Sequence, residues 1–385
     1  MKWEARARRL YQNIVRSIPL PMQLVAARAI SRAAEKSGMG KGKSEISSTD
    51  IVEGIFKTVP TAYRHRIASS LSSMGVDISG YNDSVYVQKQ KSDPEALMNT
   101  LVRLGRDLDA TVNRNSTVRA LGAVIDFFGS PVISIQTTTN LNSSRFLSVN
   151  FLELMRDHSD DPFSWALKAC AVAPVEQAMV SLNDEVRQAF ELLGYGIGLD
   201  TAAGIFKVWY ILSPEPIASF PGLSHLPLAV KKNLRYLRKA GLSRISLIGF
   251  DLKNGTLDLY VMIREPACVA PDKYDDLLND LAFETVSPRL STQCAGAGMV
   301  RFTFSWRSDA VLHVGFTRFH QNRDTMPTQL HPLIKQCVEN PVFLNGQNTF
   351  LVDTVISKED IYFGIGNDYE GSLIDEFKNA SAGGV

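Results

Sequence analysis

Two segments near the middle of the chain alternate polar and apolar residues with the two-residue period of a β-strand. They span residues 206–212 and 257–264. Successive side chains of a strand point to opposite faces, so each segment has one mainly apolar face and one mixed face. The mixed faces carry Lys207, Trp209, Asp258, Tyr260 and Met262.

A hairpin joins the second segment to the strand before it. Residues 243–250 and 257–264 flank a Lys-Asn-Gly turn, which is typical of antiparallel pairs. We assign Ser246 to the mixed face as well. An open antiparallel sheet would turn this face to water, but large rings and a methionine are costly to expose. We therefore expect the mixed face to line an enclosed lumen.

The chain after residue 94 repeats a unit of two antiparallel strands followed by helices. Further strand-like segments are 131–140, 143–154, 299–306, 310–319, 348–357 and 360–368. Antiparallel pairs that return through helices do not form a parallel sheet. The pattern predicts an α+β fold in which ten antiparallel strands close into a barrel with outer helices, and whose interior can hold a ligand.

The first 78 residues differ from the rest because helical periodicity dominates them. Three segments carry apolar residues at helical spacing, with Ser and Thr as candidate caps of the third, and residues 61–75 continue as a fourth helix. The polar stretch that follows is rich in Gly and Lys and resembles a connection between domains. We predict a helical domain over 1–78, a linker over 79–93 and a barrel domain over 94–385.

Composition narrows the function further. With 45% hydrophobic and 21% charged residues and a formal net charge of +1, the chain is an ordinary globular protein with no electrostatic case for nucleic acid. Its four cysteines lack the spacing of a zinc site and suggest reduced thiols. No apolar run approaches the length of a membrane span. We expect a cytoplasmic protein.

Residues 220–261, FPGLSHLPLAVKKNLRYLRKAGLSRISLIGFDLKNGTLDLYV, resemble a helix and hairpin of the soluble aromatic prenyltransferases of the ABBA class, or PT barrels, the CloQ/NphB-like family. Residues 300–306 with 311–316, and residues 348–366, resemble that family's last strand pairs. The resemblance implies an enzyme that transfers an allylic prenyl group from a prenyl diphosphate to an electron-rich aromatic small molecule. More weakly, about the first sixty residues resemble the small helical C-terminal module of the B component of light-independent protochlorophyllide reductase. Three roles stay open for this module: forming a homodimer, capping the lumen or recruiting a partner.

The resemblance also implies roles for individual residues. Ionisation of an allylic diphosphate creates an anion, which cations stabilise, and an allyl cation, which aromatic faces stabilise and shield from water. Lys207 corresponds to a diphosphate-binding lysine, Tyr260 to a tyrosine that shields the carbocation, and Trp209 and Phe304 to rings that wall the pocket. We predict catalytic roles for Lys207, Asp258, Tyr260 and His313, and substrate contacts for Asn150, Trp209, Ser246, Met262, Phe302, Phe304, Gly315 and Phe363.

Several positions depart from the family pattern. Asn150 stands where magnesium-dependent members place an Asp, so no metal site of that type is expected, Mg²⁺ is not expected to be essential, and we predict no other cofactor. Asp258 replaces a neutral diphosphate-binding side chain and is close enough to pair with Lys207. Val311 replaces a diphosphate-binding Arg, and Phe363 replaces a Lys. The predicted diphosphate clamp is therefore reduced.

Other interpretations remain open for these residues. Lys207 could be the structural partner of a buried Asp258, the rings could simply fill the barrel, and His313 could be a hydrogen-bonded core histidine. Gly315 allows either close ligand approach or a strand bend. A barrel without the diphosphate clamp could perform acid–base cyclisation or rearrangement, or carry an aromatic ligand. Three or more cations near Lys207 would favour prenyl transfer, and Lys207 bonded only to Asp258 would favour the alternative chemistry.

Overall fold

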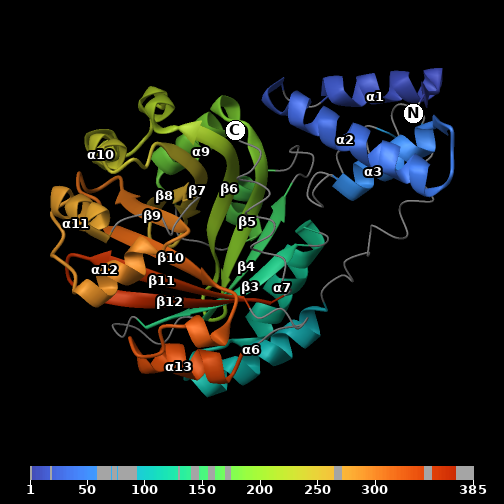
Figure 1. Ribbon diagram of the computed structural model, residues 1–385. Coiled ribbons are helices and arrows are strands. Elements are labelled where there is room, and N and C mark those ends of the chain that lie inside the picture. The colour runs from blue at the N-terminus through green and yellow to red at the C-terminus, as the bar shows by residue number, and fades with distance from the viewer. Residues whose placement is uncertain are drawn as a thin grey trace. The chain divides into compact units, whose positions relative to one another are not determined.

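Ten antiparallel strands form a closed barrel in the larger part of the molecule, as Figure 1 shows for this computed structural model. The structure describes residues 2–17, 20–58, 71, 76, 93–128, 131–139, 147–154, 161–169, 175–263, 271–341 and 349–369. The predicted linker at 79–93 lies almost entirely outside the described residues.

The order of strands around the barrel is β10-β11-β12-β3-β4-β5-β6-β7-β8-β9, and each pairs antiparallel with both neighbours. The strands are β3 (Val132–Thr138), β4 (Leu147–Leu154), β5 (Leu192–Asp200), β6 (Gly204–Pro216), β7 (Arg244–Asp251), β8 (Thr256–Met262), β9 (Met299–Ser305), β10 (His313–His320), β11 (Phe350–Ser357) and β12 (Ile361–Asp368). The closed antiparallel barrel predicted from the alternation is confirmed.

Helices cover the outside of the barrel, as Figure 1 shows. They are α6 (Pro94–Leu108), α7 (Arg114–Phe128), α8 (Pro162–Ala169), α9 (Gln177–Ala189), α10 (Leu228–Lys239), α11 (Pro271–Asp280), α12 (Pro288–Ala295) and α13 (Pro332–Glu339), with short 3₁₀ helices at Ile217–Gly222 and Arg323–Thr325. Strand residues such as Val208, Leu257 and Phe316 share one apolar core with helix residues such as Leu101 and Leu237. The outward strand faces are therefore buried.

The N-terminal region forms a separate compact unit of its own. It contains α1 (Ala5–Ser17), α2 (Leu20–Gly40), α3 (Ser48–Thr58) and two short paired strands, β1 (Lys2–Trp3) and β2 (Glu45–Ile46). Its core includes Leu10, Ile14, Ile30, Ile51 and Ile55. The three helices expected from periodicity are present, and the fourth, over 61–75, lies outside the described residues apart from Leu71. Among the described residues, no helix is both long and apolar enough to cross a bilayer.

Candidate active site

The pairing register brings the predicted polar residues to the inner face of the barrel. Trp209 lies opposite Gly249, Gly249 opposite Asp258, Asp258 opposite Thr303, and Thr303 opposite His313. Residues directly opposite each other on neighbouring strands point to the same face of a sheet. These positions therefore form one row along the inner wall, over strands β6 to β10.

Asp258 is the centre of the interior hydrogen-bond network and is only 2% exposed. Its carboxylate forms a hydrogen-bonded ion pair with the Lys207 ammonium. The Thr303 hydroxyl donates to Oδ1 at 2.6 Å, and the Tyr260 hydroxyl donates to Oδ2 at 3.2 Å. The Arg301 guanidinium lies 3.8 Å from Oδ2. Each of these four neighbours is a donor or a cation, so together they hold Asp258 as a carboxylate.

The electrostatics agree with this arrangement. Burial alone would raise the pKa of Asp258, but the charges of Lys207 and Arg301 outweigh burial and hold that pKa below its ordinary value. Burial opposes the charged form of Lys207, yet the Asp258 carboxylate raises the pKa of the lysine. Both groups are therefore charged at neutral pH.

A second ion pair lies beside the first. Arg301 donates to Oδ2 of Asp353 at 2.9 Å, and the Thr317 hydroxyl donates to Oδ1 of the same carboxylate at 3.2 Å. A Cβ at Gly315 would lie 2.9 Å from Asp353 and 3.0 Å from Arg301, so glycine leaves the space that this pair occupies. Arg301 and Asp353 were not predicted. The interior cluster of Lys207, Asp258, Arg301 and Asp353 is thus electrically balanced.

Trp209 and Tyr260 flank the Lys207 ammonium. Lys207 Nζ lies 5.4 Å from the centroid of the Trp209 ring and 5.8 Å from that of Tyr260, and the indole N–H donates to the Tyr260 hydroxyl at 3.0 Å. A Cβ added at Gly196, Gly198 or Gly249 would come within 3.1 Å of the Trp209 ring. These glycines let the indole lie close against the wall.

The inner wall of the barrel has an apolar part and a polar part. One inner cluster is apolar and joins Leu152, Ile211 and Leu247 to Tyr260, with Trp209 and Met262 packed against it. Across the lumen wall, the Asn150 amide lies 3.5 Å from the Ser134 hydroxyl and 3.4 Å from the Gln136 carbonyl oxygen. Asn150 and Met262 face the lumen, as predicted.

His313 occupies the same inner row as Thr303. Its ring packs edge-on against Tyr362 with centroids 6.2 Å apart. Burial and then the charge of Arg301 lower the pKa of His313 below its ordinary value of 6.5. A neutral imidazole facing the interior can accept a proton.

The predicted interior positions of Phe302 and Phe304 are wrong. Both belong to the outer core with Val300, whereas Arg301 and Thr303 point inward. The strand 299–305 has one bulky apolar face and one polar face, and the polar face lines the lumen, as in β6 and β8. The alternation itself contained this information.

Three further assignments are corrected in the same way. Phe363 belongs to the outer core, and its ring lies 6.4 Å from that of His331 at the start of α13. Ser246 alternates with the inward Leu247 and lines an outer recess with Tyr274. Val311 precedes β10 and is buried in the outer core instead of the lumen.

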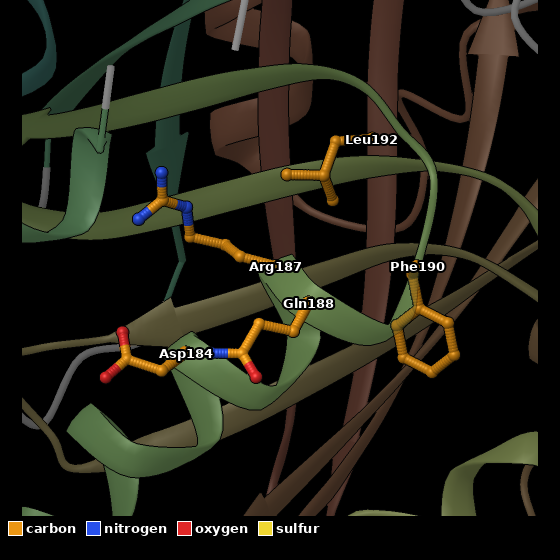
Figure 2. Close-up of a pocket in the computed structure, with 5 residues that line it drawn as sticks. All are labelled: Asp184, Arg187, Gln188, Phe190 and Leu192. Carbon is orange, nitrogen blue, oxygen red and sulfur yellow. The ribbon is translucent and has the colours of Figure 1, made fainter. Parts of the chain in front are cut away.

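A surface pocket of about 390 Å³ lies outside this cluster, at the end of α9 and the start of β5 (Figure 2). Its lining is Asp184, Arg187, Gln188, Phe190 and Leu192. None of these residues belongs to the interior cluster.

Comparison with known proteins assigns the barrel to a family. Residues 93–381 match the model of a family described as aromatic prenyltransferase Orf2. The chain belongs to this family. It is 22% identical over 260 residues to a furaquinocin biosynthesis prenyltransferase of Streptomyces sp. (strain KO-3988), covering 66% of this chain and 83% of that protein. The match begins at residue 93, so it does not include the helical N-terminal unit.

Solved structures with a similar arrangement include two dimethylallyltryptophan synthases. The 5-dimethylallyltryptophan synthase of Streptomyces coelicolor has a TM-score of 0.47 at 12% identity, covering 72% of this chain and 97% of that one. A 6-dimethylallyl tryptophan synthase has a TM-score of 0.49 at 12% identity, covering 73% and 97%. The predicted family is thus confirmed by the family match, and the fold by the barrel itself.

Proposed function

We propose that the barrel interior transfers an allylic prenyl group from a prenyl diphosphate to an electron-rich aromatic small molecule. The observation that supports this most strongly is the Lys207 ammonium between the faces of Trp209 and Tyr260. Such a site offers a cation to the departing diphosphate and aromatic faces to the allyl cation. The surrounding apolar cluster excludes water that would quench the cation.

The reaction breaks the C–O bond to the diphosphate, which leaves with the bonding electrons. A ring carbon of the acceptor then attacks the allyl cation, and the ring releases one proton. When the diphosphate takes Lys207 as its partner, Asp258 loses its closest cation and becomes more basic. Asp258 or the neutral His313 would take up the proton, and Arg301 supplies a second cation.

Binding and product analysis test this proposal. Calorimetry with dimethylallyl and geranyl diphosphates should detect binding, and mass spectrometry should detect a prenylated aromatic acceptor. Asp258→Asn should bind the diphosphate about tenfold or more tightly, because a competing carboxylate charge is removed, while turnover falls. If neither diphosphate binds to the wild-type protein, with or without Mg²⁺, prenyl transfer is excluded.

A second candidate is chemistry on a hydrophobic aromatic or polyene substrate that carries no diphosphate. The electrical balance of the interior cluster favours it, because both cations already have carboxylate partners. Among the described residues, the interior cations are Lys207 and Arg301. This is fewer than the three expected for prenyl transfer and more than the single Lys207 expected for the alternative chemistry. An acid role for Asp258 conflicts with its lowered pKa, so a proton-triggered cyclisation is the weaker form of this candidate.

We further propose that the reaction does not require Mg²⁺. In support, the wall at Asn150 presents neutral amides and hydroxyls from Ser134 and Gln136, which are poor partners for a hard divalent cation compared with carboxylates. Turnover that persists in EDTA would agree with this proposal. Turnover abolished by EDTA and restored by Mg²⁺ would contradict it.

Two broader expectations accompany this function: a cytoplasmic location and a homodimer formed through the N-terminal helical unit. Sedimentation of the full chain beside a chain beginning at Ser92 tests the second expectation. A monomeric full chain would rule out the dimer.

A further inference from the structure

Basic residues are concentrated at the start of the chain. Residues 2–43 contain ten Lys and Arg but only two acidic residues, Glu4 and Glu35. The whole chain has 41 basic and 40 acidic residues, so the remainder is net acidic. A near-neutral total therefore hides a strong charge asymmetry between the two parts of the sequence.

Helix α2 arranges part of this charge in one line. Arg28, Arg32 and Lys36 follow each other at four-residue spacing, and Met39 comes eleven residues after Arg28. At about 100° per residue, these four side chains fall within about 80° of the helix circumference. We call them the α2 stripe. All four are exposed, whereas Ile30 and Ala34 on the opposite side are buried.

The charges of the α2 stripe have no partners within the described residues. Glu35 is the only acidic residue of α2, and its carboxylate accepts a hydrogen bond from Ser31. Lys41 and Lys43 differ, because their ammonium groups form ion pairs with the carboxylates of Glu53 and Asp50. Within the part of the chain that the structure describes, the stripe is therefore an unpaired cationic surface.

Helix α1 also exposes basic side chains. It contains four arginines and no acidic residue, and Arg6, Arg8 and Arg9 are exposed while Leu10 is buried. The two helices are joined by a hydrogen bond of 3.0 Å from the Tyr11 hydroxyl to the Ala27 carbonyl, directly before Arg28 in the chain.

A helix of the barrel provides an internal comparison. Helix α10 carries five basic residues and no acidic residue, and Leu228 at its start is 55% exposed. However, Lys232 pairs with Asp309 at 2.7 Å and Lys239 with Asp280 at 2.6 Å. Carboxylates from neighbouring segments thus neutralise part of α10, and no described carboxylate does this for the α2 stripe.

We propose that the α2 stripe, supported by the arginines of α1, binds the surface of a membrane rich in anionic lipids. Clusters of four to eight basic residues bind such surfaces, and each basic residue contributes about a factor of five in affinity. Met39 is 62% exposed at the C-terminal end of the stripe. It favours lipid over nucleic acid, because a thioether can enter the boundary between headgroups and acyl chains and gains little from a phosphate backbone.

Vesicle flotation of the full chain tests this surface. Wild-type protein should float with phosphatidylcholine vesicles containing about a third phosphatidylglycerol, and much less with pure phosphatidylcholine, and added salt should weaken the binding. Removing three charges in Arg28→Gln/Arg32→Gln/Lys36→Gln should weaken binding about 100-fold. Met39→Ser should weaken it by a smaller factor.

The matched control removes three cations from α10 in Lys231→Gln/Lys232→Gln/Arg238→Gln, and Leu228→Ser matches Met39→Ser. These variants should bind vesicles nearly as well as the wild type. Equal loss in both triple variants would show nonspecific attraction and overturn the proposal. So would unchanged binding of the α2 variant, or binding to a DNA or RNA duplex, but not to vesicles, that depends on the stripe. Circular dichroism verifies the fold of each variant, and none of these measurements depends on turnover.

Discussion

The two faces of the barrel strands differ in what they are made of and in what covers them. Outward positions such as Leu259, Phe302 and Phe316 are apolar and packed against helices. Inward positions include two ion pairs, hydroxyls and glycines. Burial of apolar area is the main source of stability, whereas a buried ion pair contributes little net stability. The outer face therefore holds the barrel together, and this leaves the inner face available for chemistry.

The largest effect is expected from Lys207→Met. Loss of the cation should reduce turnover about 100- to 1,000-fold and, because Asp258 would be left buried without its closest partner, lower the free energy of unfolding by about 3–5 kcal/mol. Steady-state kinetics and urea denaturation measure the two effects.

The double variant Lys207→Met/Asp258→Asn is its control. Removing both charges should restore most of the stability but not the turnover. A double variant that regains turnover would show that Lys207 has only a structural role.

The converse change is Phe302→Ala on the outer face. A cavity among the helices should lower the free energy of unfolding by about 3–4 kcal/mol, while turnover per folded molecule stays unchanged. Denaturation and kinetics at low temperature check both. A loss of turnover larger than the loss of folded protein would contradict the assignment of Phe302 to the outer face.

A smaller effect should follow from Gly315→Ala. The new methyl group would displace the Arg301–Asp353 pair and lower stability by about 1–3 kcal/mol. Gly366→Ala is the matched control, because a Cβ there would meet its nearest neighbour at an ordinary 3.5 Å. Thermal denaturation should separate the two variants, and equal shifts would argue against crowding at Gly315.

The smallest effect concerns His320, the last residue of β10. Burial lowers its pKa from 6.5 to about 4, and its Nε2 is buried without a hydrogen-bond partner within the described part of the chain. The unfolded chain then binds this proton more readily, so stability should decrease by about 1–2 kcal/mol as the pH falls from 6.5 towards 4.

Denaturation at several pH values tests this decrease. His320→Gln should flatten the pH dependence. If the variant at position 320 keeps the pH slope of the wild type, the loss of stability at low pH does not come from His320.

The sequence predicted the barrel and the inward Lys207, Asp258 and Tyr260, because polar residues at alternate positions mark a lumen when large rings accompany them. The same rule applied to 299–305 would have placed Arg301 inside. There, the family resemblance placed Phe304 among the rings that wall the pocket, and this reversed the assignment. Asp353, a single carboxylate in an apolar strand, follows the same rule and was missed as well.

Other features are not accessible to alternation alone. The contact between Arg301 and Asp353 depends on the pairing register across β9, β10 and β11. The alternation of polar and apolar residues within one strand does not determine that register. The space at Gly315 likewise depends on side chains from neighbouring strands. The basic N-terminal surface was missed for a simpler reason, because the net charge of the whole chain conceals it.

The closure of the strand ring has a consequence for how such a protein can diverge. No strand ends the sheet, so no row of backbone amides and carbonyls is left to recruit a foreign strand when inner side chains change. Substitutions at lumen-facing positions such as Asp258 and Asn150 can then accumulate while the barrel persists. An architecture of this kind tolerates gradual drift in substrate preference without a growing tendency to aggregate.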